Sequence, residues 1–127
     1  MKIEEFERLV AEEFPRAVPD KFRSRIRNVG FVVEDEPSSE IRSREGLSDD
    51  ETLLGLYQGI PMTERGESYG IGPVVPDMIT LYRIPILEAA GASVVEIRKV
   101  IRDTIWHEVA HHFGFSEHDV ASREKER

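Results

Sequence analysis

The four histidines of the chain all fall within twelve positions near its C-terminal end, in the stretch IWHEVAHHFGFSEHD. His107 and His111 stand four residues apart, and Glu108 directly follows the first of them. On an α-helix, two imidazoles at this spacing lie one turn apart on the same side and can bind one zinc ion. Zinc lowers the pKa of a bound water to about 7, and a glutamate between the ligands can accept its proton. This H-E-x-x-H pattern predicts metal-assisted hydrolysis of an amide bond, with Glu108 as the general base.

A third protein ligand has to come from beyond the helix, because one helix supplies only two ligands to one ion. Gly114 can adopt a positive φ without strain, so the chain can turn back at that point. Glu117, His118 and Asp119 follow within five more residues, and all three carry atoms that bind metals. The spacing alone leaves the choice among them open.

The histidine stretch lies late in the clearest predicted element, a helix from Val94 to about Phe113. Ser93 with Glu96 three residues later has the pattern of a capping box, and Gly114 stands where a left-handed C-cap is expected. His112 falls on the apolar side of this helix, so we expect a hydrogen-bonded structural role for it rather than metal binding. The residues expected on the core-facing arc are Val94, Ile97, Ile101, Ile105, Trp106, Val109 and Phe113.

Hydrophobic periodicity and turn residues predict the remaining elements. Residues 48–59 have two interpretations: a short helix opened by Ser48 and Glu51, or a strand with its leucines and Tyr57 inside. Pro85 lacks a ladder donor, which indicates that the strand around it lies at a sheet edge or ends there. If it lies at an edge, residues 78–84 could pair with an extended peptide. The other predicted elements are a helix over 2–14, a strand centred on 29–33, an irregular segment over 61–76 and a strand over 77–87.

Length and composition limit the classes of protein to consider. A chain of 127 residues is expected to form one domain, residues 1–127. It has no cysteine, no apolar run that could span a membrane and no secretory signal, which together favour a cytoplasmic protein. The net charge of −8 makes nucleic acid an improbable partner, because the chain would be repelled by phosphate backbones.

The stretch HEVAHHFGFSE is similar to the extended zincin pattern H-E-x-x-H-x-x-G-x-x-(H/D). Together with GIPMTERG and PDMITLYRIPILEAAG, it resembles the short bacterial zincin-like metallopeptidases, or minimal zincins. The resemblance implies an α+β fold in which a small mixed or antiparallel sheet packs on the long H-E-x-x-H helix. By position, His107 and His111 match the zinc ligands and Glu108 matches the general base. Glu117 falls where the family has its third ligand, usually Asp, or His in metzincins; His118 is the alternative, one residue further on.

The function expected from these observations is that of a zinc-dependent metallopeptidase acting on an extended peptide or an unfolded protein segment. The alternative is a catalytically silent metal-binding module that interacts with a protein partner. Glu108 favours the first, because a carboxylate between two ligands has no role in a purely structural site. A structural site would instead close its fourth position with a protein ligand, which His118 could provide.

Overall fold

The computed structural model describes residues 1–23, 28–59 and 76–114, and these form an α+β arrangement as predicted. No helix in these described ranges is long and apolar enough to cross a membrane. The elements in chain order are α1 (Ile3–Ala17), α2 (Asp20–Arg23), β1 (Val29–Glu34), α3 (Ser39–Arg44), β2 (Gly55–Gln58), β3 (Asp77–Tyr82), α4 (Arg83–Ala90) and α5 (Val94–Phe113).

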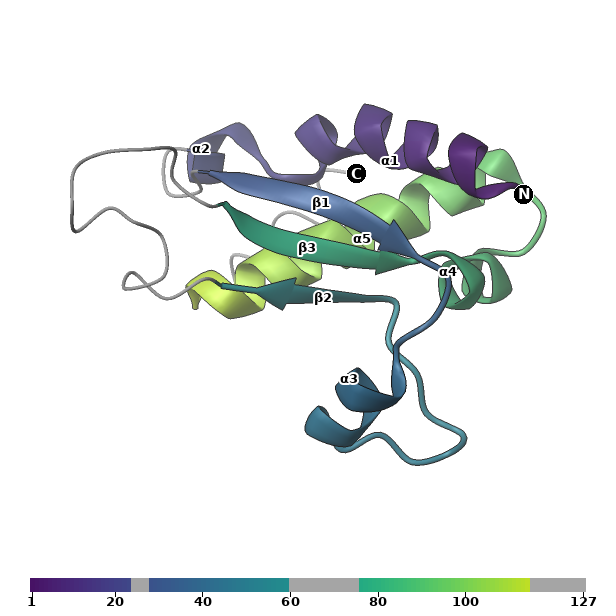
Figure 1. Cartoon of the computed structure of the whole chain (residues 1–127). Helices are drawn as coiled ribbons and strands as arrows, with labels where there is room; N and C mark the ends of the chain where they lie inside the picture. The colour runs from purple at the N-terminus through teal and green to yellow at the C-terminus, as the bar shows by residue number, and fades with distance from the viewer. Residues whose placement is uncertain (24–27, 60–75, 115–127) are drawn as a thin grey trace.

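The described strands form one mixed, three-stranded sheet in the order β1-β3-β2 (Figure 1). β1 pairs with β3 in parallel and β2 pairs with β3 antiparallel, with Tyr57 opposite Ile79. β3 is therefore the central strand, and the expectation that it could lie at an edge is wrong. Its burial explains the central position, since Ile79 and Leu81 are fully buried and Thr80 and Tyr82 nearly so. β1 and β2 lie at the two edges of this sheet, and β2 is the edge strand that contacts α5.

The strand expected over residues 77–87 ends at Tyr82, and the rest of that segment is helix α4. Pro85 is the third residue of α4, where a backbone N–H has no acceptor inside the helix. The missing donor of proline therefore costs nothing at this position. Pro85 correctly indicated the end of a strand, but it lies within the first turn of the helix that follows.

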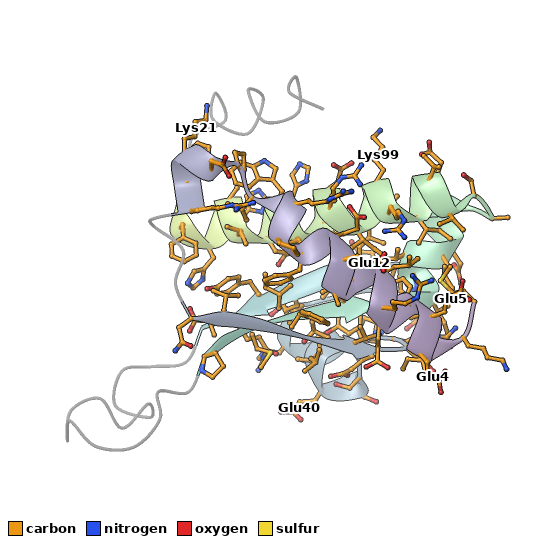
Figure 2. All side chains as sticks on the ribbon, turned by 90° about the horizontal axis from the view of Figure 1, so that it is seen from above. Glu4, Glu5, Glu12, Lys21, Glu40 and Lys99 are labelled. Carbon is orange, nitrogen blue, oxygen red and sulfur yellow. The ribbon has the colours of Figure 1, made fainter. Side chains whose placement is uncertain are left out.

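α1 and α5 form a layer of helices on one face of the sheet, as Figures 1 and 2 show. α1 runs to Ala17 and includes Pro15, so it is longer than the predicted helix over 2–14. Burying each large apolar side chain between these layers stabilises the fold by about 1.5–3 kcal/mol. The main core cluster contains Phe6, Leu9, Val10, Ala17, Ile79, Leu81, Ile86, Ile97, Ile101, Ile105 and Val109.

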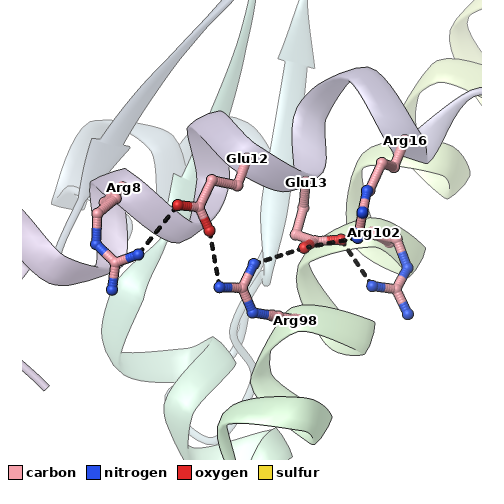
Figure 3. A network of polar contacts seen from close by, with 6 residues as sticks. All are labelled: Arg8, Glu12, Glu13, Arg16, Arg98 and Arg102. Carbon is pink, nitrogen blue, oxygen red and sulfur yellow. Dashed lines mark hydrogen bonds and ion pairs between the residues drawn. The ribbon is translucent and has the colours of Figure 1, made fainter.

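An ion-pair network also joins α1 to α5 (Figure 3). Glu13 is completely buried, and its two carboxylate oxygens accept hydrogen bonds from Arg98 and Arg102, each at 2.7 Å. Arg98 also donates to Glu12 at 2.7 Å, and Glu12 accepts from Arg8 at 3.0 Å. A buried carboxylate is tolerated only when it is paired and hydrogen-bonded, and here both oxygens are satisfied.

The segment between β1 and β2 differs from expectation in two ways. The strand interpretation of residues 48–59 is correct, but the strand covers only Gly55–Gln58. Ser48 and Glu51 do bond to each other, with Ser48 N donating to Glu51 Oε1 at 2.8 Å, but they close a turn rather than open a helix. α3 was not predicted; its N-cap is Ser38, whose hydroxyl accepts from Ile41 N at 3.1 Å.

Candidate metal centre

α5 carries the H-E-x-x-H residues in its last turns, and the predicted bounds of this helix are confirmed. At its start, Ser93 Oγ accepts a hydrogen bond from Glu96 N at 3.4 Å. At its end, Gly114 takes the left-handed conformation with φ 71° and ψ 31°, and its N–H bonds back to the last helical carbonyls. Most of the predicted core-facing arc is buried, although Val94 is 45% exposed. The two caps and the buried stripe fix both the length of the helix and its rotation against the sheet.

His107 and His111 lie on the same side of α5, with their ring centroids 6.4 Å apart. His107 Nδ1 lies 2.8 Å from the carbonyl oxygen of Asp103. Because a carbonyl only accepts, Nδ1 must be the protonated nitrogen, and the lone pair of the neutral ring is then on Nε2. A hydrogen bond of this kind fixes the tautomer and orientation of most zinc-binding histidines. The protonation and orientation of His107 therefore fit those of a zinc ligand.

Glu108 projects toward β2, where its Oε1 accepts a hydrogen bond from the backbone N–H of Tyr57 at 3.0 Å. Burial raises the pKa of the Glu108 carboxyl above its ordinary value, although the Tyr57 N–H and the two neighbouring histidines act in the opposite direction. A carboxyl with a raised pKa is suited to accepting a proton and then returning it.

Tyr57 is a site residue that the sequence did not identify. Its hydroxyl donates to Asp77 Oδ2 at 2.7 Å, and its ring stacks on His112 with centroids 3.9 Å apart. The expectation that His112 lies on the buried side is wrong, because its side chain is 38% exposed. Its expected structural role is consistent with the stacking. No local pattern marks Tyr57, because it lies 51 residues from Glu108 in the sequence.

A cavity of about 440 Å³ opens beside His107 and Glu108. Its walls come from Leu54 and Gly55 at the start of β2, from Ala89 of α4, and from Val100 and Thr104 of α5. Most of these side chains are apolar or small. The cavity therefore has space for an apolar group beside Glu108.

The candidate third ligands Glu117 and His118, together with Asp119, lie outside the described residues. In residues 1–23, 28–59 and 76–114, no group of three or more His, Asp, Glu or Cys side chains is placed to hold a metal ion. The described part of the candidate centre thus consists of two imidazoles, one carboxylate and the cavity beside them.

A family model described as zincin-like metallopeptidase matches residues 26–127. The match includes every described element from β1 to α5, and α1 and α2 precede it. No curated protein matches the chain. Among solved structures, a conserved hypothetical protein from Thermus thermophilus is similar, with 21% sequence identity and a TM-score of 0.47. That likeness covers 91% of this chain and 100% of the other.

Proposed function

This chain belongs to the zincin-like metallopeptidase family, and on that premise we propose that it is a zinc-dependent peptidase that hydrolyses peptide bonds. The observation that carries the proposal is the placement of Glu108. Its partly buried carboxylate follows His107 on α5, faces the edge strand β2 and borders a cavity. A general base needs this combination of a raised pKa, a fixed orientation and nearby space for a substrate.

We propose that His107 and His111 hold the zinc ion through their Nε2 atoms. Glu117 is the proposed third ligand, with His118 as the alternative. A zinc ion there would supply Lewis acidity, which acidifies water and polarises a peptide carbonyl. The hydrogen bond from His107 to the Asp103 carbonyl supports this assignment, because it orients the ring and directs its lone pair outward from α5.

Glu108 would act as the proton carrier of the reaction. Its carboxylate accepts a proton from the attacking water and then passes that proton to the leaving amine. The Tyr57 N–H holds one carboxylate oxygen, Oε1, so the other oxygen can be directed toward the water.

The proposed substrate is an extended peptide or an unfolded segment that lies along β2. Leu54 O accepts from Tyr82 N in β3, so in an antiparallel pair the polar backbone groups of the next residue, Gly55, point away from β3. A peptide strand could bond to them by strand addition. One of its side chains could then enter the cavity lined by Leu54, Ala89 and Val100. This location replaces the strand over residues 78–84, which is central in the sheet.

The experiment that tests the function uses the full chain without a histidine tag. Zinc content is measured first, and cleavage of a peptide library and of a denatured protein is then compared between the native chain and Glu108→Gln. We expect close to one zinc per chain in both, and a loss of about 10²–10⁴-fold in cleavage rate for the variant, the range typical of general-base catalysis. If zinc binds and neither form cleaves any substrate, the chain is a metal-binding interaction module instead. If the two forms cleave equally, Glu108 is not the base.

A further inference from the structure

We propose that Tyr57, anchored by Asp77, is a positioning residue that holds the Glu108 carboxylate in its working orientation. This inference rests on the proposed function, because Glu108 is the general base of that function. Tyr57 does not touch the reacting atoms. It acts through its backbone N–H, which its anchored side chain holds in place.

The direction of the Tyr57 N–H follows from the pairing of β2 with β3. Because Leu54 pairs with Tyr82 through its carbonyl, the N–H groups of Gly55 and Tyr57 point away from β3. On an edge strand, a group with this direction ordinarily faces solvent or an added strand. Here it donates to Glu108 Oε1 at 3.0 Å instead, so β2 and α5 are joined at the position of the proposed base.

The Tyr57 side chain is anchored through its hydroxyl. Its hydroxyl donates to Asp77 Oδ2 at 2.7 Å, and Asp77 is only 8% exposed. Asp77 is the first residue of the central strand β3, and its own N–H donates to Asn28 O at 3.0 Å. The acceptor of the Tyr57 hydroxyl is thus fixed within the sheet.

The ring of Tyr57 is held as well. It stacks on His112 at 3.9 Å between centroids and meets Phe113 edge-on at 5.9 Å, and both residues belong to the last turn of α5. Tyr57 therefore contacts β3 through its hydroxyl and α5 through its ring. With both fixed, rotation of β2 that would withdraw the N–H from Glu108 is opposed.

A glycine allows the close approach of β2 to α5. A Cβ at Gly55 would lie 2.7 Å from Thr104 Cγ2 and 3.0 Å from Thr80 O. A side chain there would force β2 away from α5 and would lengthen the bond between Tyr57 N and Glu108. The short distance thus depends on the absence of a side chain at residue 55 and on the anchored side chain at residue 57.

The hydrogen bond from Tyr57 limits the rotamers available to the Glu108 carboxylate. Within the described residues, the Glu108 carboxylate accepts one hydrogen bond, the one from the Tyr57 N–H. Without it, the carboxylate could adopt other rotamers, and the oxygen that serves the water would be correctly directed for a smaller fraction of the time. Tyr57 is not among the proposed zinc ligands and does not line the cavity beside Glu108, so we expect zinc content and KM to change little.

One test measures amide hydrogen exchange of the full chain by NMR, and it is independent of any activity. The outward-pointing Tyr57 N–H should be protected in the native chain. Glu108→Ala should lower its protection about tenfold, because a hydrogen bond to a charged group is lost. Protection of the Ile79 N–H in the centre of the sheet serves as the control and should stay unchanged. A Tyr57 N–H that exchanges at the same rate in both forms would overturn the proposal.

The other test measures kinetics. Tyr57→Phe keeps the ring and removes the bond to Asp77; we expect kcat to fall about tenfold, with KM within about twofold and zinc content unchanged. Asp77→Asn retains a side-chain oxygen acceptor and should keep most of kcat, whereas Asp77→Leu should match Tyr57→Phe. Adding Asp77→Leu to Tyr57→Phe should cause no further loss. Tyr82→Phe, the same change in the neighbouring strand, is the matched control and should leave kcat unaltered.

The outcomes separate the two proposals. If kcat is unaltered in Tyr57→Phe, or if zinc content and KM change in place of kcat, the positioning role is wrong although the chain is still a peptidase. If the native chain cleaves nothing, the proposed function fails, and the exchange experiment still decides whether Tyr57 holds Glu108.

Discussion

The Nδ1 atom of His107 donates a hydrogen bond to the carbonyl oxygen of Asp103, one turn earlier on α5, at 2.8 Å. The acceptor belongs to the main chain of the helix itself. The tautomer that suits metal binding is therefore set by helix geometry, and no side-chain substitution at residue 103 removes the acceptor.

The first prediction concerns the two helical ligands. His107→Ala or His111→Ala should lower zinc affinity by more than the roughly 10–100-fold that loss of an outer hydrogen-bond partner costs, because a direct ligand is removed. His112→Ala is the matched control, since it makes the same change one residue further along α5. Zinc titration against a competing chelator measures all three. Full zinc affinity in His111→Ala would contradict the proposed ligand set.

The second prediction identifies the third ligand. Glu117→Ala should weaken zinc binding strongly, while His118→Ala should leave it close to that of the native chain. The reason is position: Glu117 is the third residue after Gly114, as the extended zincin pattern requires of the third ligand. The same chelator titration applies, and the reverse result would assign the third ligand to His118.

The third prediction concerns the cavity beside Glu108. Val100→Phe should fill part of it and shift cleavage from peptides with large apolar side chains toward those with small ones. A mismatch of one methylene group in an apolar pocket changes kcat/KM by about 10–200-fold, so the ratio of rates for leucine and alanine peptides should fall at least about tenfold. Val95→Phe is the control, because Val95 is 73% exposed on the same helix and does not line the cavity. An unchanged preference in Val100→Phe would show that no substrate side chain enters there.

The fourth prediction concerns stability. Glu13→Gln should lower the free energy of unfolding by about 2–4 kcal/mol, because a buried carboxylate that two arginines share is lost. Glu12→Gln is the control; the Glu12 side chain is 43% exposed, and its loss should cost less than about 1 kcal/mol. Urea unfolding of both variants at pH 7 measures the difference. Equal losses in the two variants would contradict the importance of burial.

The pH dependence of this difference provides a further check. Burial raises the pKa of Glu13, but the hydrogen bonds from Arg102 and Arg98 outweigh it and hold that pKa below its ordinary value. The stabilisation is therefore complete above the ordinary glutamate pKa of about 4.3 and is lost as the pH falls through the lowered pKa of the folded state. The gap between the native chain and Glu13→Gln should narrow in that acidic range, as urea unfolding at successive pH values would show.

Local signals predicted the part of the fold that carries the histidines. Ser93 and Gly114 mark the two ends of α5, and both act as caps in the structure. Such signals depend on residues a few positions apart, so they are readable in the sequence. The same holds for β1, whose β-branched and aromatic residues define it.

Properties set by residues far apart in the sequence were not predictable in this way. The apolar stretch that contains Pro85 suits both a strand and the first turn of a helix, and its own residues do not decide between them. The central position of β3 depends on its pairing with β1 and β2, which come from separate parts of the chain. The hydrogen bond from Tyr57 to Glu108 joins residues 51 positions apart, so it could not be predicted from the spacing of the H-E-x-x-H residues.

The packing of α1 on α5 predicts how a shortened chain without α1 would behave. A chain reduced to the stretch that the family model matches would begin at residue 26 and would lose Phe6, Leu9 and Glu13. The side of α5 that packs on α1 would then expose isoleucines to water, and Arg98 and Arg102 would lose their carboxylate partners on α1. We expect such a fragment to aggregate. We therefore expect that residues before the stretch matched by the family model are needed for a stable fold.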